Sequence, residues 1–486
     1  MKQSDALKIL DAGASVFLTG APGAGKTYVL NQFISSARAA GKIVSITATT
    51  GIASTHINGQ TIHSWSGMGV AQAPTEALLR RVRTYRGKAI RRADVLVIDE
   101  ISMMPAWQFD MVDRICRAIR HDAGHPFGGL QVVISGDLFQ LPPVVRTNRG
   151  NSDDGLRMDP DVAQYRQSYA DAGHDPDGFI TESFVWRDFD PVVCYLTEQH
   201  RQDHGELLSV LTHIREGAVT PADRAVLDGR VGAVPVDMPI VRLYPTNRQA
   251  DQLNDMRLYQ LPGMSHDFIA TSTGSPTLVK QLKRSMLAPE RLSLKKGAVV
   301  MALRNDSERR YVNGSIGVVT DFEKRLSSGA PSAASEAAGG APIVSFDNGN
   351  VVTMHPADWQ ITDNDAVLAE VSQIPLRCAW GITIHKSQGM TLDAAVMDLR
   401  RTFAPGMGYV ALSRVESLDG LYLEGVGPRA FEVSEGAMRI DRELVARSEK
   451  ACETLGCVGA IALTKVDGAS STDDGEDDEF AQGVLF

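Results

Sequence analysis

The sequence predicts an α/β protein built from two parallel sheets flanked by helices, with a small β-barrel inserted into the second α/β unit. Short apolar, β-rich runs alternate with helix-length segments, which is typical of parallel strands linked by crossover helices. The first set of runs lies at residues 15–19, 43–47, 95–98 and 131–135. The second, interrupted set lies at residues 240–244, 394–399 and 421–423. A chain of 486 residues is long enough for about three domains.

The inserted barrel is predicted from a change of pattern between residues 296 and 365. Its β-type runs lie at residues 298–303, 315–322, 343–346 and 351–355. The last two are joined through Asn348-Gly349. Asn-Gly is a strong hairpin signal because both central residues of a type I′ turn need positive φ. Residues 327–342 are rich in Gly, Ala and Ser, and we expect them to form a flexible loop.

The charge of the chain is concentrated in two acidic segments. The formal net charge is −10, which by itself argues against a polyanionic partner. Residues 466–486 contain seven acids and no base, and residues 151–178 contain seven acids and two arginines. The rest of the chain therefore carries a net charge of +2. A slightly basic body remains compatible with nucleic-acid binding.

The cysteines and the apolar segments favour a cytoplasmic protein with no membrane partner. The chain has five cysteines without metal-type pairing, which is typical of a reducing compartment and does not predict a zinc site. Its first ten residues contain no apolar signal core, and no run approaches the roughly 18 apolar residues of a membrane span.

A phosphate-binding loop is predicted directly after the first strand. Residues 20–27 read G-x-x-x-x-G-K-T and lead into a helix-forming segment. Small residues allow backbone N–H groups to surround phosphates, and the helix N-terminus adds its dipole. Lys26 is placed to reach the terminal phosphates, and the Thr27 hydroxyl to coordinate Mg²⁺. The alternative is a glycine-rich turn that binds no ligand.

Two further apolar strands end in polar residues. Residues 95–98 lead into Asp99 and Glu100, which are placed to hold Mg²⁺ and to deprotonate an attacking water, respectively. The strand at 131–135 leads into a segment containing Gln140, which could sense the γ-phosphate and convey its state toward a bound polymer. Alternatively, the acids begin a surface turn and Gln140 is an ordinary loop residue.

Seven blocks of the sequence are similar, in order and character, to those of the Pif-one DNA helicases of superfamily one, whose relatives include RecD-type helicases. The blocks lie at residues 20–27, 97–103, 126–131, 136–143, 197–201, 383–389 and 409–414. The resemblance covers roughly residues 1–425. It implies an α/β fold with two RecA-like P-loop NTPase motor domains, ATP between them, a small insertion in the first domain and an SH3-like β-barrel in the second.

The domain boundaries expected from this resemblance follow the pattern changes. They are 1–190 for the first motor domain (1A), with 55–92 as a DNA-contacting wedge (1B) and 151–178 as an acidic surface insertion; 191–295 and 366–430 for the second motor domain (2A); 296–365 for the SH3-like insertion (2B); 431–465 for a C-terminal extension; and 466–486 for an acidic disordered tail.

The resemblance also implies roles for individual residues at the nucleotide. Gln3 matches the glutamine that reads adenine, and Arg201 and Arg414 match two arginines that reach the γ-phosphate across the domain interface. Planar cations stabilise charge spread over phosphate oxygens. The implied catalytic residues are Lys26, Asp99, Glu100, Gln140, Arg201 and Arg414. The implied nucleotide-binding residues are Gln3, Gly20, Ala21, Pro22, Gly23, Ala24, Gly25, Lys26, Thr27, Tyr28 and Gly389, with Thr27 and Asp99 as ligands of Mg²⁺.

The DNA-binding residues follow from the same resemblance and from a basic run. Residues 80–92 contain seven basic residues and no acid. This run lies where the family carries its strand-separating insertion, so we expect phosphate contacts, although a solvated helix face is the alternative. The expected DNA-binding residues are Thr49, Gly51, Thr61, His63, Arg80, Arg81, Arg83, His385, Lys386, Ser387 and Gln388.

The function implied by the resemblance is an ATP- and Mg²⁺-dependent DNA helicase that moves 5′→3′ on single strands and unwinds duplex or structured DNA in replication, recombination or repair. Its expected partners are single-stranded DNA and single-strand/duplex junctions, and we expect a monomer, nucleoid-associated if bacterial. The alternatives are a DNA-stimulated ATPase that remodels protein on DNA with little unwinding, a nuclease subunit, and a scaffold in which ATP is a structural switch.

The last five residues suggest a further partner. Gln482, Gly483, Val484, Leu485 and Phe486 are similar to the Gln-x-x-Leu-Phe peptides by which bacterial proteins bind the replication sliding clamp. The alternative is a frayed chain end.

Overall fold

The computed structural model describes most of the chain. The described residues are 1–50, 53–54, 57, 59–69, 71–143, 159–198, 205–232, 234, 240–286, 288–306, 308, 310–323, 340–363 and 366–454. The predicted tail at 466–486, and the predicted flexible loop at 327–342 up to residue 339, lie outside these ranges. Among the helices in these ranges, none combines the length and the apolar character that crossing a membrane requires.

The first sheet contains six parallel strands in the order β3-β2-β4-β5-β1-β6. Four of them coincide, within a residue or two, with the runs predicted from the sequence. The strands are β1 (Val16–Gly20), β2 (Val44–Ala48), β3 (Gln60–Thr61), β4 (Val95–Asp99), β5 (Gln131–Ser135) and β6 (Val192–Leu196). Because β6 pairs with β1, the first motor domain extends beyond the predicted boundary at residue 190.

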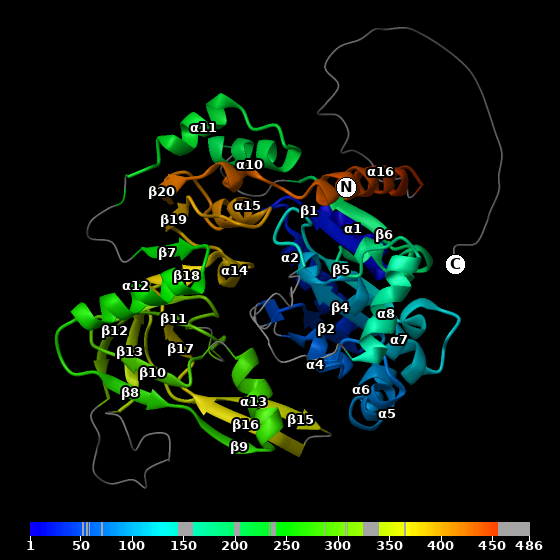
Figure 1. The fold of residues 1–486 in the computed structure, drawn as a ribbon, viewed down its shortest axis with the longest axis horizontal. Coiled ribbons are helices and arrows are strands. Elements are labelled where there is room, and N and C mark those ends of the chain that lie inside the picture. Colours follow the sequence, from blue (N-terminus) through cyan, green and yellow to red (C-terminus); the bar gives the residue numbers. More distant parts are fainter. Residues whose placement is uncertain are drawn as a thin grey trace.

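Helices cover both faces of this sheet (Figure 1). Successive side chains of β4 point to opposite faces: Val95 and Val97 pack with α1 and α2, whereas Leu96 and Ile98 pack with α7. Burial on both faces explains why β4 begins with four consecutive apolar residues. The helices are α1 (Gln3–Asp11), α2 (Lys26–Ala39), α4 (Ile62–Ser66), α5 (Glu76–Tyr85), α6 (Gly87–Arg92), α7 (Ala106–Arg120), α8 (Pro160–Asp171) and α9 (Val185–Phe189), with short 3₁₀ helices η1 (Ile101–Met103), η2 (Pro126–Gly129) and η3 (Ile180–Glu182).

The described part of the acidic segment at 151–178 is anchored to the first domain. Asp159 caps α8, and Pro160 occupies its first turn. Tyr169 on this helix is fully buried, and its hydroxyl donates a hydrogen bond to the Asp110 carboxylate of α7. The Tyr169 ring also lies 4.4 Å from that of Phe184, between ring centroids. An aromatic anchor therefore holds this segment against α7.

The second sheet has four parallel strands in the order β18-β7-β19-β20. The chain leaves this sheet after β7 and returns at β18, as the interrupted pattern predicts. The strands are β7 (Val241–Tyr244), β18 (Gly381–Thr383), β19 (Ala395–Leu399) and β20 (Leu421–Val426); the helices are α10 (Glu206–Glu216), α11 (Pro221–Asp228), α12 (Asn247–Gln260), α14 (Ile384–Ser387), α15 (Met407–Leu412) and α16 (Glu435–Thr454), with η5 (Pro428–Phe431).

Antiparallel strands fill the interruption and lie below the second sheet in Figure 1. They start before residue 296 and end after residue 365, so the insertion is longer on both sides than the β-type runs indicated. A five-stranded sheet contains β11 (Val299–Ala302), β12 (Ile316–Phe322), β13 (Pro342–Phe346), β14 (Val351–Thr353) and β17 (Leu376–Cys378). A second sheet pairs β8 (His266–Ile269) with β10 (Arg291–Leu294). A third sheet contains β9 (Thr271–Gly274), β15 (Ala357–Asp363) and β16 (Ala366–Gln373) and lies beside α13 (Pro276–Ser285).

The predicted hairpin between β13 and β14 is present, but its turn differs from the predicted type I′. Gly349 has a φ of 84°, whereas Asn348 is not among the residues with positive φ. The Gly349 N–H donates to the Phe346 carbonyl at 2.9 Å, and the Phe346 N–H donates to the Asn350 carbonyl at 2.9 Å. This three-residue loop with a left-handed glycine uses the same Asn-Gly signal in a different turn.

Candidate nucleotide and DNA site

The phosphate loop lies between β1 and α2, and it requires glycine where the chain turns into the helix. Gly25 precedes α2 with a φ of 84°, in the left-handed region. A Cβ at Gly25 would lie 2.0 Å from Nε2 of Gln3. Gly23 also has positive φ, and Pro22 and Ala24 are buried. The sequence therefore folds here into a loop whose backbone can approach a ligand closely.

Gln3 lies against this loop, as the resemblance implies for an adenine-reading residue. Its side-chain Nε2 donates to the Ala24 carbonyl at 3.1 Å, and its backbone N–H donates to Oε2 of Glu198 at 2.7 Å. Tyr28, at the start of α2, is exposed. Gln3 is thus positioned at the edge of the loop by partners from two other segments.

Lys26 points back toward the loop that precedes it. Its Nζ donates to the carbonyl oxygens of Gly20 at 2.7 Å and Ala21 at 3.1 Å. Burial lowers the pKa of Lys26, while the nearby carboxylates of Asp137, Glu100 and Asp99 act in the opposite direction. The ammonium group therefore lies among the acids at the ends of β4 and β5.

The two acids predicted at the end of β4 are adjacent and partly buried. Glu100 has a φ of 53°, which turns the chain sharply after Asp99. Burial raises the pKa of Asp99, and burial together with the Asp99 charge raises the pKa of Glu100 to about 7. Gln388 Nε2 donates to Glu100 Oε2 at 2.9 Å. The second motor domain therefore contacts one of these acids directly.

Gln140 is buried in the loop after β5. Among the described residues its Oε1 has no hydrogen-bond partner, and neither has Oε1 of Gln388. A buried amide oxygen without a partner lowers the stability of the fold unless a water, an ion or a ligand binds to it. Gly406, directly before α15, approaches the loop closely, since a Cβ there would lie 2.7 Å from the Gln140 carbonyl.

Arg414 is buried just after α15. Its Nε donates to the Val410 carbonyl at 2.8 Å, and its Nη1 to the Met390 carbonyl at 3.0 Å. Its charge lowers the pKa of Glu100, which places the guanidinium within electrostatic reach of that acid. Gly389, with a φ of 79°, lies in the turn after α14. The other predicted arginine, Arg201, lies outside the described residues.

Several predicted DNA-binding residues also have structural contacts. Thr49 is buried, and its hydroxyl donates to the Glu100 carbonyl at 2.9 Å. Thr61 caps α4 by accepting the Ser64 N–H at 3.3 Å. His63 has a ring nitrogen 3.1 Å from Nε2 of Gln108. Gly51 lies outside the described residues. Thr49 therefore links the segment after β2 to the backbone of an acid in the nucleotide site.

The block at 385–388 is less exposed than a simple DNA-contact surface. Ser387 is fully buried and donates to the Ile384 carbonyl at 2.8 Å. Burial lowers the pKa of His385 and of Lys386. The His385 ring stacks with that of Phe403 at 6.1 Å between centroids. Two residues of this block contact the nucleotide site: Gln388 donates to Glu100, and the Ser387 carbonyl accepts a hydrogen bond from Arg414 Nη1 at 3.3 Å.

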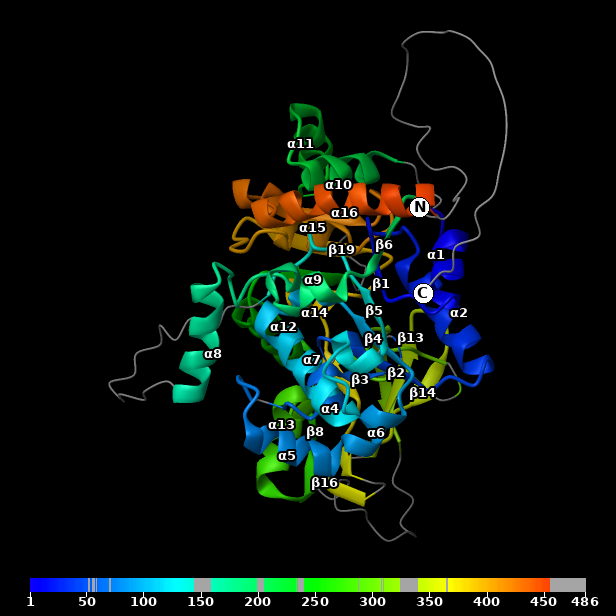
Figure 2. The same ribbon diagram turned by 90° about the vertical axis from the view of Figure 1, so that its right-hand side faces the viewer.

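The predicted wedge arginines lie on one exposed side of α5. Leu78 and Val82 on this helix are buried, whereas Arg80, Arg81 and Arg83 are exposed. Figure 2 shows α5 and α6 at the end of the first domain remote from α16. The exposed arginines agree both with phosphate contacts and with a solvated helix face.

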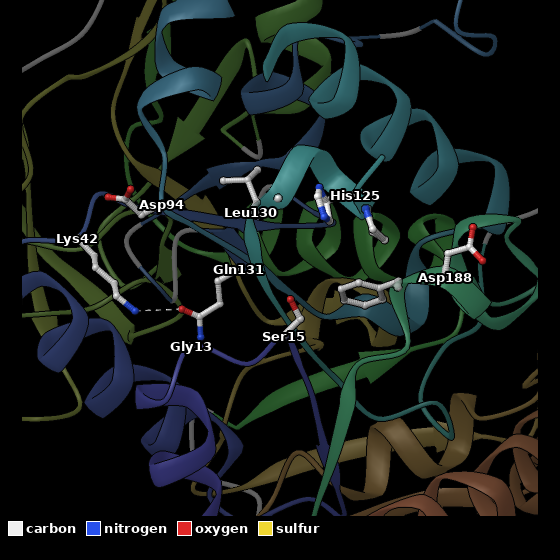
Figure 3. A pocket seen from close by; sticks show the side chains of 11 residues that line it. Gly13, Ser15, Lys42, Asp94, His125, Leu130, Gln131 and Asp188 are labelled. Carbon is white, nitrogen blue, oxygen red and sulfur yellow. Dashed lines mark hydrogen bonds between the residues drawn. The ribbon is translucent and has the colours of Figure 1, made fainter. Parts of the chain in front are cut away.

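A pocket of about 400 Å³ lies elsewhere, at the amino ends of the strands of the first sheet (Figure 3). Its polar side chains have partners: Lys42 donates to Gln131 Oε1 at 3.3 Å, and Asp94 accepts the Ile43 N–H at 2.8 Å. The phosphate loop and the β4 acids lie at the opposite, carboxyl ends of these strands, where α/β proteins bind ligands. This pocket is therefore separate from the candidate nucleotide site.

The sequence motifs predict no role for Arg215, although the structure buries it next to the predicted site. Its Nη1 donates to the Asp137 carboxylate at 2.8 Å and to the Tyr409 hydroxyl at 3.1 Å. A signal was present, because Arg215 falls four residues after Leu211 and eight after Leu207 on the apolar stripe of α10. A charged residue on such a stripe needs buried partners.

A phosphate loop, an acid pair after a parallel strand and a buried arginine from a second α/β unit define a P-loop NTPase motor with two RecA-like domains. Comparison with known proteins identifies the family. The family descriptions "PIF1-like helicase" and "DNA helicase Pif1, 2B domain" match residues 4–157 and 277–322. The second match begins before residue 296, in agreement with the longer insertion seen in the structure.

Relatives and solved structures agree over most of the chain. The ATP-dependent DNA helicase Pif1 of Psychrobacter is 38% identical over 94% of this chain and 73% of its own length, and the human ATP-dependent DNA helicase PIF1 is 35% identical over 88% and 61%. Pif1 helicase from Candida albicans has a TM-score of 0.75 at 30% identity, covering 91% of this chain and 98% of its own.

Two structures from Bacteroides extend the comparison to ligand complexes. Pif1 from Bacteroides in complex with ADP-AlF4 has a TM-score of 0.69 at 27% identity, covering 91% of this chain and 96% of that one. Bacteroides Pif1 bound to single-stranded DNA has a TM-score of 0.64 at 28% identity, covering 92% and 97%. The chain belongs to the PIF1-like helicase family, so the predicted family, fold class and enzyme class are confirmed.

Proposed function

We propose that this chain couples ATP hydrolysis to 5′→3′ movement along single-stranded DNA and unwinds the duplex ahead of it. The observation that carries the proposal is the 2.9 Å hydrogen bond from Gln388 to Glu100. It joins the segment expected to couple DNA to ATP in the second domain with the acid expected to activate water in the first. The 5′→3′ direction rests on the resemblance to this family.

The residues of the site support a division of labour in hydrolysis. Lys26 would transfer its hydrogen bonds from the loop carbonyls to the terminal phosphates, and Glu100 would accept the proton of the attacking water. Arg414 would stabilise the charge on the γ-phosphate. Asp99 and Thr27 offer the carboxylate and hydroxyl oxygens that suit Mg²⁺, which when bound neutralises phosphate charge.

Contacts between the expected DNA segments and the acids support coupling in the other direction. Thr49 donates to the backbone carbonyl of Glu100, and Gln388 donates to its side chain. Single-stranded DNA that ordered the segments of Thr49 and Gln388 would therefore restrain Glu100 at its backbone and at its side chain. DNA binding would in this way favour the geometry for hydrolysis.

The test compares ATP turnover with and without single-stranded DNA, and unwinding of duplexes with 5′ or 3′ tails. We expect DNA to stimulate turnover and only the 5′-tailed duplex to be unwound, both requiring Mg²⁺ and both abolished by EDTA. Stimulation without unwinding would favour the alternative of an ATPase that remodels protein on DNA. Unwinding of only the 3′-tailed duplex would contradict the proposed direction.

The exposed arginines of α5 support a second prediction, for the wedge. Replacing Arg80, Arg81 and Arg83 simultaneously by alanine is expected to slow unwinding at least about tenfold. The slope of log affinity for single-stranded DNA against log salt concentration should become shallower by about two, as the loss of three phosphate contacts would cause. DNA-free ATP turnover should not change. The matched control replaces three exposed arginines of α9 and α16: Arg187, Arg439 and Arg442.

Equal unwinding by the α5 variant and the control would mean that the basic run is only a solvated helix face. Fluorescence-based unwinding of a forked duplex and binding titrations at several salt concentrations provide the two measurements. Both variants should retain the thermal stability of the natural chain, because the replaced side chains are exposed.

We also propose that residues 482–486 bind a bacterial sliding clamp and that the acidic residues before them weaken single-strand binding. Deleting 482–486 should abolish clamp binding with DNA affinity unchanged. Deleting 466–481 should leave clamp binding intact and raise single-strand affinity at low salt. Surface plasmon resonance with immobilised clamp and DNA separates the two effects, and unchanged clamp affinity in the first variant would contradict the clamp proposal.

We propose further that the protein acts as a monomer in the cytoplasm, associated with the nucleoid if the cell is bacterial. The chain has a mass of 52.5 kDa, and light scattering should give that mass with and without nucleotide. A doubled mass would contradict the monomer. Fractionation of cells should place the protein with soluble protein and DNA, and recovery with membranes would contradict the location.

A further inference from the structure

A buried network centred on Arg215 joins the two motor domains beside the nucleotide site. Arg215 lies near the end of α10 and is 7% exposed. One terminal nitrogen, Nη1, donates to Asp137 at 2.8 Å and to the Tyr409 hydroxyl at 3.1 Å. The other, Nη2, donates to the Tyr195 hydroxyl at 2.8 Å and to Asp441 at 3.0 Å. A single guanidinium therefore holds four partners.

These partners come from different parts of the fold. Asp137 follows β5, and Tyr195 lies in β6 of the first sheet, whereas Tyr409 lies in α15 of the second motor domain. Asp441 lies in α16, which follows β20 in the chain but is attached to the first sheet. The Ser448 hydroxyl of α16 accepts the Tyr195 N–H at 3.1 Å. The network thus spans the boundary between the two domains.

The same arginine contacts the loop that carries Gln140. Its guanidinium lies over the ring of Phe139, 4.3 Å from the centroid. The Tyr409 hydroxyl donates to the second oxygen of Asp137 at 2.9 Å, so both oxygens of this carboxylate are bound by residues of the second domain. The loop from Asp137 to Gln140 is therefore held at its start and in its middle.

Helix α15 connects this loop to Arg414. Gly406 precedes the helix, and a Cβ there would lie 2.5 Å from the Phe139 carbonyl, so the two backbones are in close contact. Tyr409 lies one turn later, and Arg414 follows the end of the helix, where its Nε binds the Val410 carbonyl. A displacement of the loop relative to α15 would therefore change the separation between Gln140 and Arg414.

Stability alone does not account for such a network. Desolvation of the charges largely offsets their attraction when an ion pair is buried, so the net stabilisation is small. What a fully bonded buried network does provide is a fixed orientation of the groups it joins. Here those groups include the loop of Gln140 and the helix before Arg414.

We propose that Arg215 is a positioning residue for ATP hydrolysis, holding the Asp137–Gln140 loop against α15 so that Gln140 and Arg414 face one γ-phosphate when DNA closes the motor domains. The inference rests on the proposed function, because it assumes DNA-stimulated hydrolysis. Arg215 itself reaches no substrate in this assignment. Its loss should affect turnover at saturating ATP rather than ATP binding.

The experiment measures kcat and KM for ATP, with and without single-stranded DNA, in the full-length chain. Arg215→Lys keeps the positive charge but removes the guanidinium, whose two terminal nitrogens bind Asp137 and Asp441 at the same time. We expect kcat with DNA to fall at least about tenfold, because small misplacements of catalytic groups have large effects, while KM stays within about twofold. Tyr409→Phe, which removes one hydroxyl, should give a smaller fall in kcat and no change in KM. The matched control is Arg224→Lys: Arg224 lies in the neighbouring helix α11, and its guanidinium lies over the ring of Phe431 in η5, 4.4 Å from the centroid.

Two results would overturn the proposal. One is an unchanged DNA-stimulated kcat in Arg215→Lys and in Tyr409→Phe. The other is a rise in KM without a fall in kcat, which would assign Arg215 to nucleotide binding. If Arg215→Lys does not fold, Tyr409→Phe decides by the same criteria. A natural chain that DNA does not stimulate would instead contradict the proposed function, so the two failures are distinguishable.

Discussion

Lys26→Ala is expected to lower ATP turnover with saturating single-stranded DNA by about two to three orders of magnitude, the scale seen when one preorganised donor to a developing negative charge is removed. The Lys26 Nζ lies among the carbonyls of Gly20 and Ala21 and within electrostatic reach of Asp99 and Glu100. We therefore expect its ammonium group to bind the terminal phosphates. Unwinding, which depends on turnover, should be lost as well.

The matched control for this variant is Lys42→Ala. Lys42 belongs to the same domain but lies at the opposite ends of the strands, in the pocket of Figure 3. Its loss should change turnover by no more than about twofold, as is usual for a partly exposed side chain away from the site. A coupled assay of ADP release measures both variants. Equal turnover in Lys26→Ala and the natural chain would show that residues 20–27 do not bind the hydrolysed phosphate.

Much of the fold could be predicted because its information is local. The strands β1, β4 and β5 each contain three or four consecutive large apolar residues, since both faces of the sheet are covered, and such runs are visible without any contact information. The phosphate loop is equally local, because a strand, a turn and a helix that follow one another contain the whole motif. Residues at these positions need no distant partner to be recognised.

The parts that were missed depend on distant contacts. The predicted boundary after residue 190 places residues 192–196 in the second domain, whereas they form β6 and pair with β1 of the first sheet. β9, Thr271–Gly274, is polar and becomes a strand only through pairing with β16. The hairpin at Gly349 was found but its turn type was not, because one left-handed glycine suits several loops.

The candidate site also combines residues that can be recognised locally with residues that depend on distant contacts. Lys26, Asp99 and Glu100 are adjacent to the strands that position them, and the structure brings them together as expected. Gln388 lies 288 residues from Glu100 in the chain, so their contact could be expected only through the family resemblance. The apolar stripe of α10 marks Arg215 as a buried charge, but the sequence does not identify its partners, Asp137 and Asp441.

Two of the distant contacts, Gln388 with Glu100 and Arg215 with Asp137, cross between the motor domains. Gln388 binds Glu100 and Arg215 binds Asp137, both with donors in the second domain and acceptors in the first. Binding of a shared ligand by two domains depends on how they are held relative to one another. Lys26, Asp99 and Glu100 of the first domain can therefore be recognised locally, whereas the contacts of Gln388 and Arg215 with the first domain become visible only in the folded structure.

Glu100→Gln is expected to separate ATP binding from ATP hydrolysis. Glutamine has nearly the same shape as glutamate, and its amide oxygen can still accept the hydrogen bond from Gln388, so the 2.9 Å contact can persist. It cannot accept a proton from water at neutral pH. Loss of a general base lowers turnover by about two to four orders of magnitude. In the natural chain, burial and Asp99 raise the pKa of Glu100 to about 7, which suits a base near neutral pH.

The measurement compares turnover with equilibrium binding of a fluorescent ATP analogue in the presence of single-stranded DNA. Glu100→Gln should bind the analogue within about threefold of the natural affinity, because the substitution preserves size and the Gln388 contact. Asp94→Asn is the control, since Asp94 precedes the same strand, β4, at its other end and accepts the Ile43 N–H. Turnover in Glu100→Gln that equalled the control would assign the proton transfer to another group. A parallel loss of binding and turnover would mean that Glu100 orders the site rather than activating water.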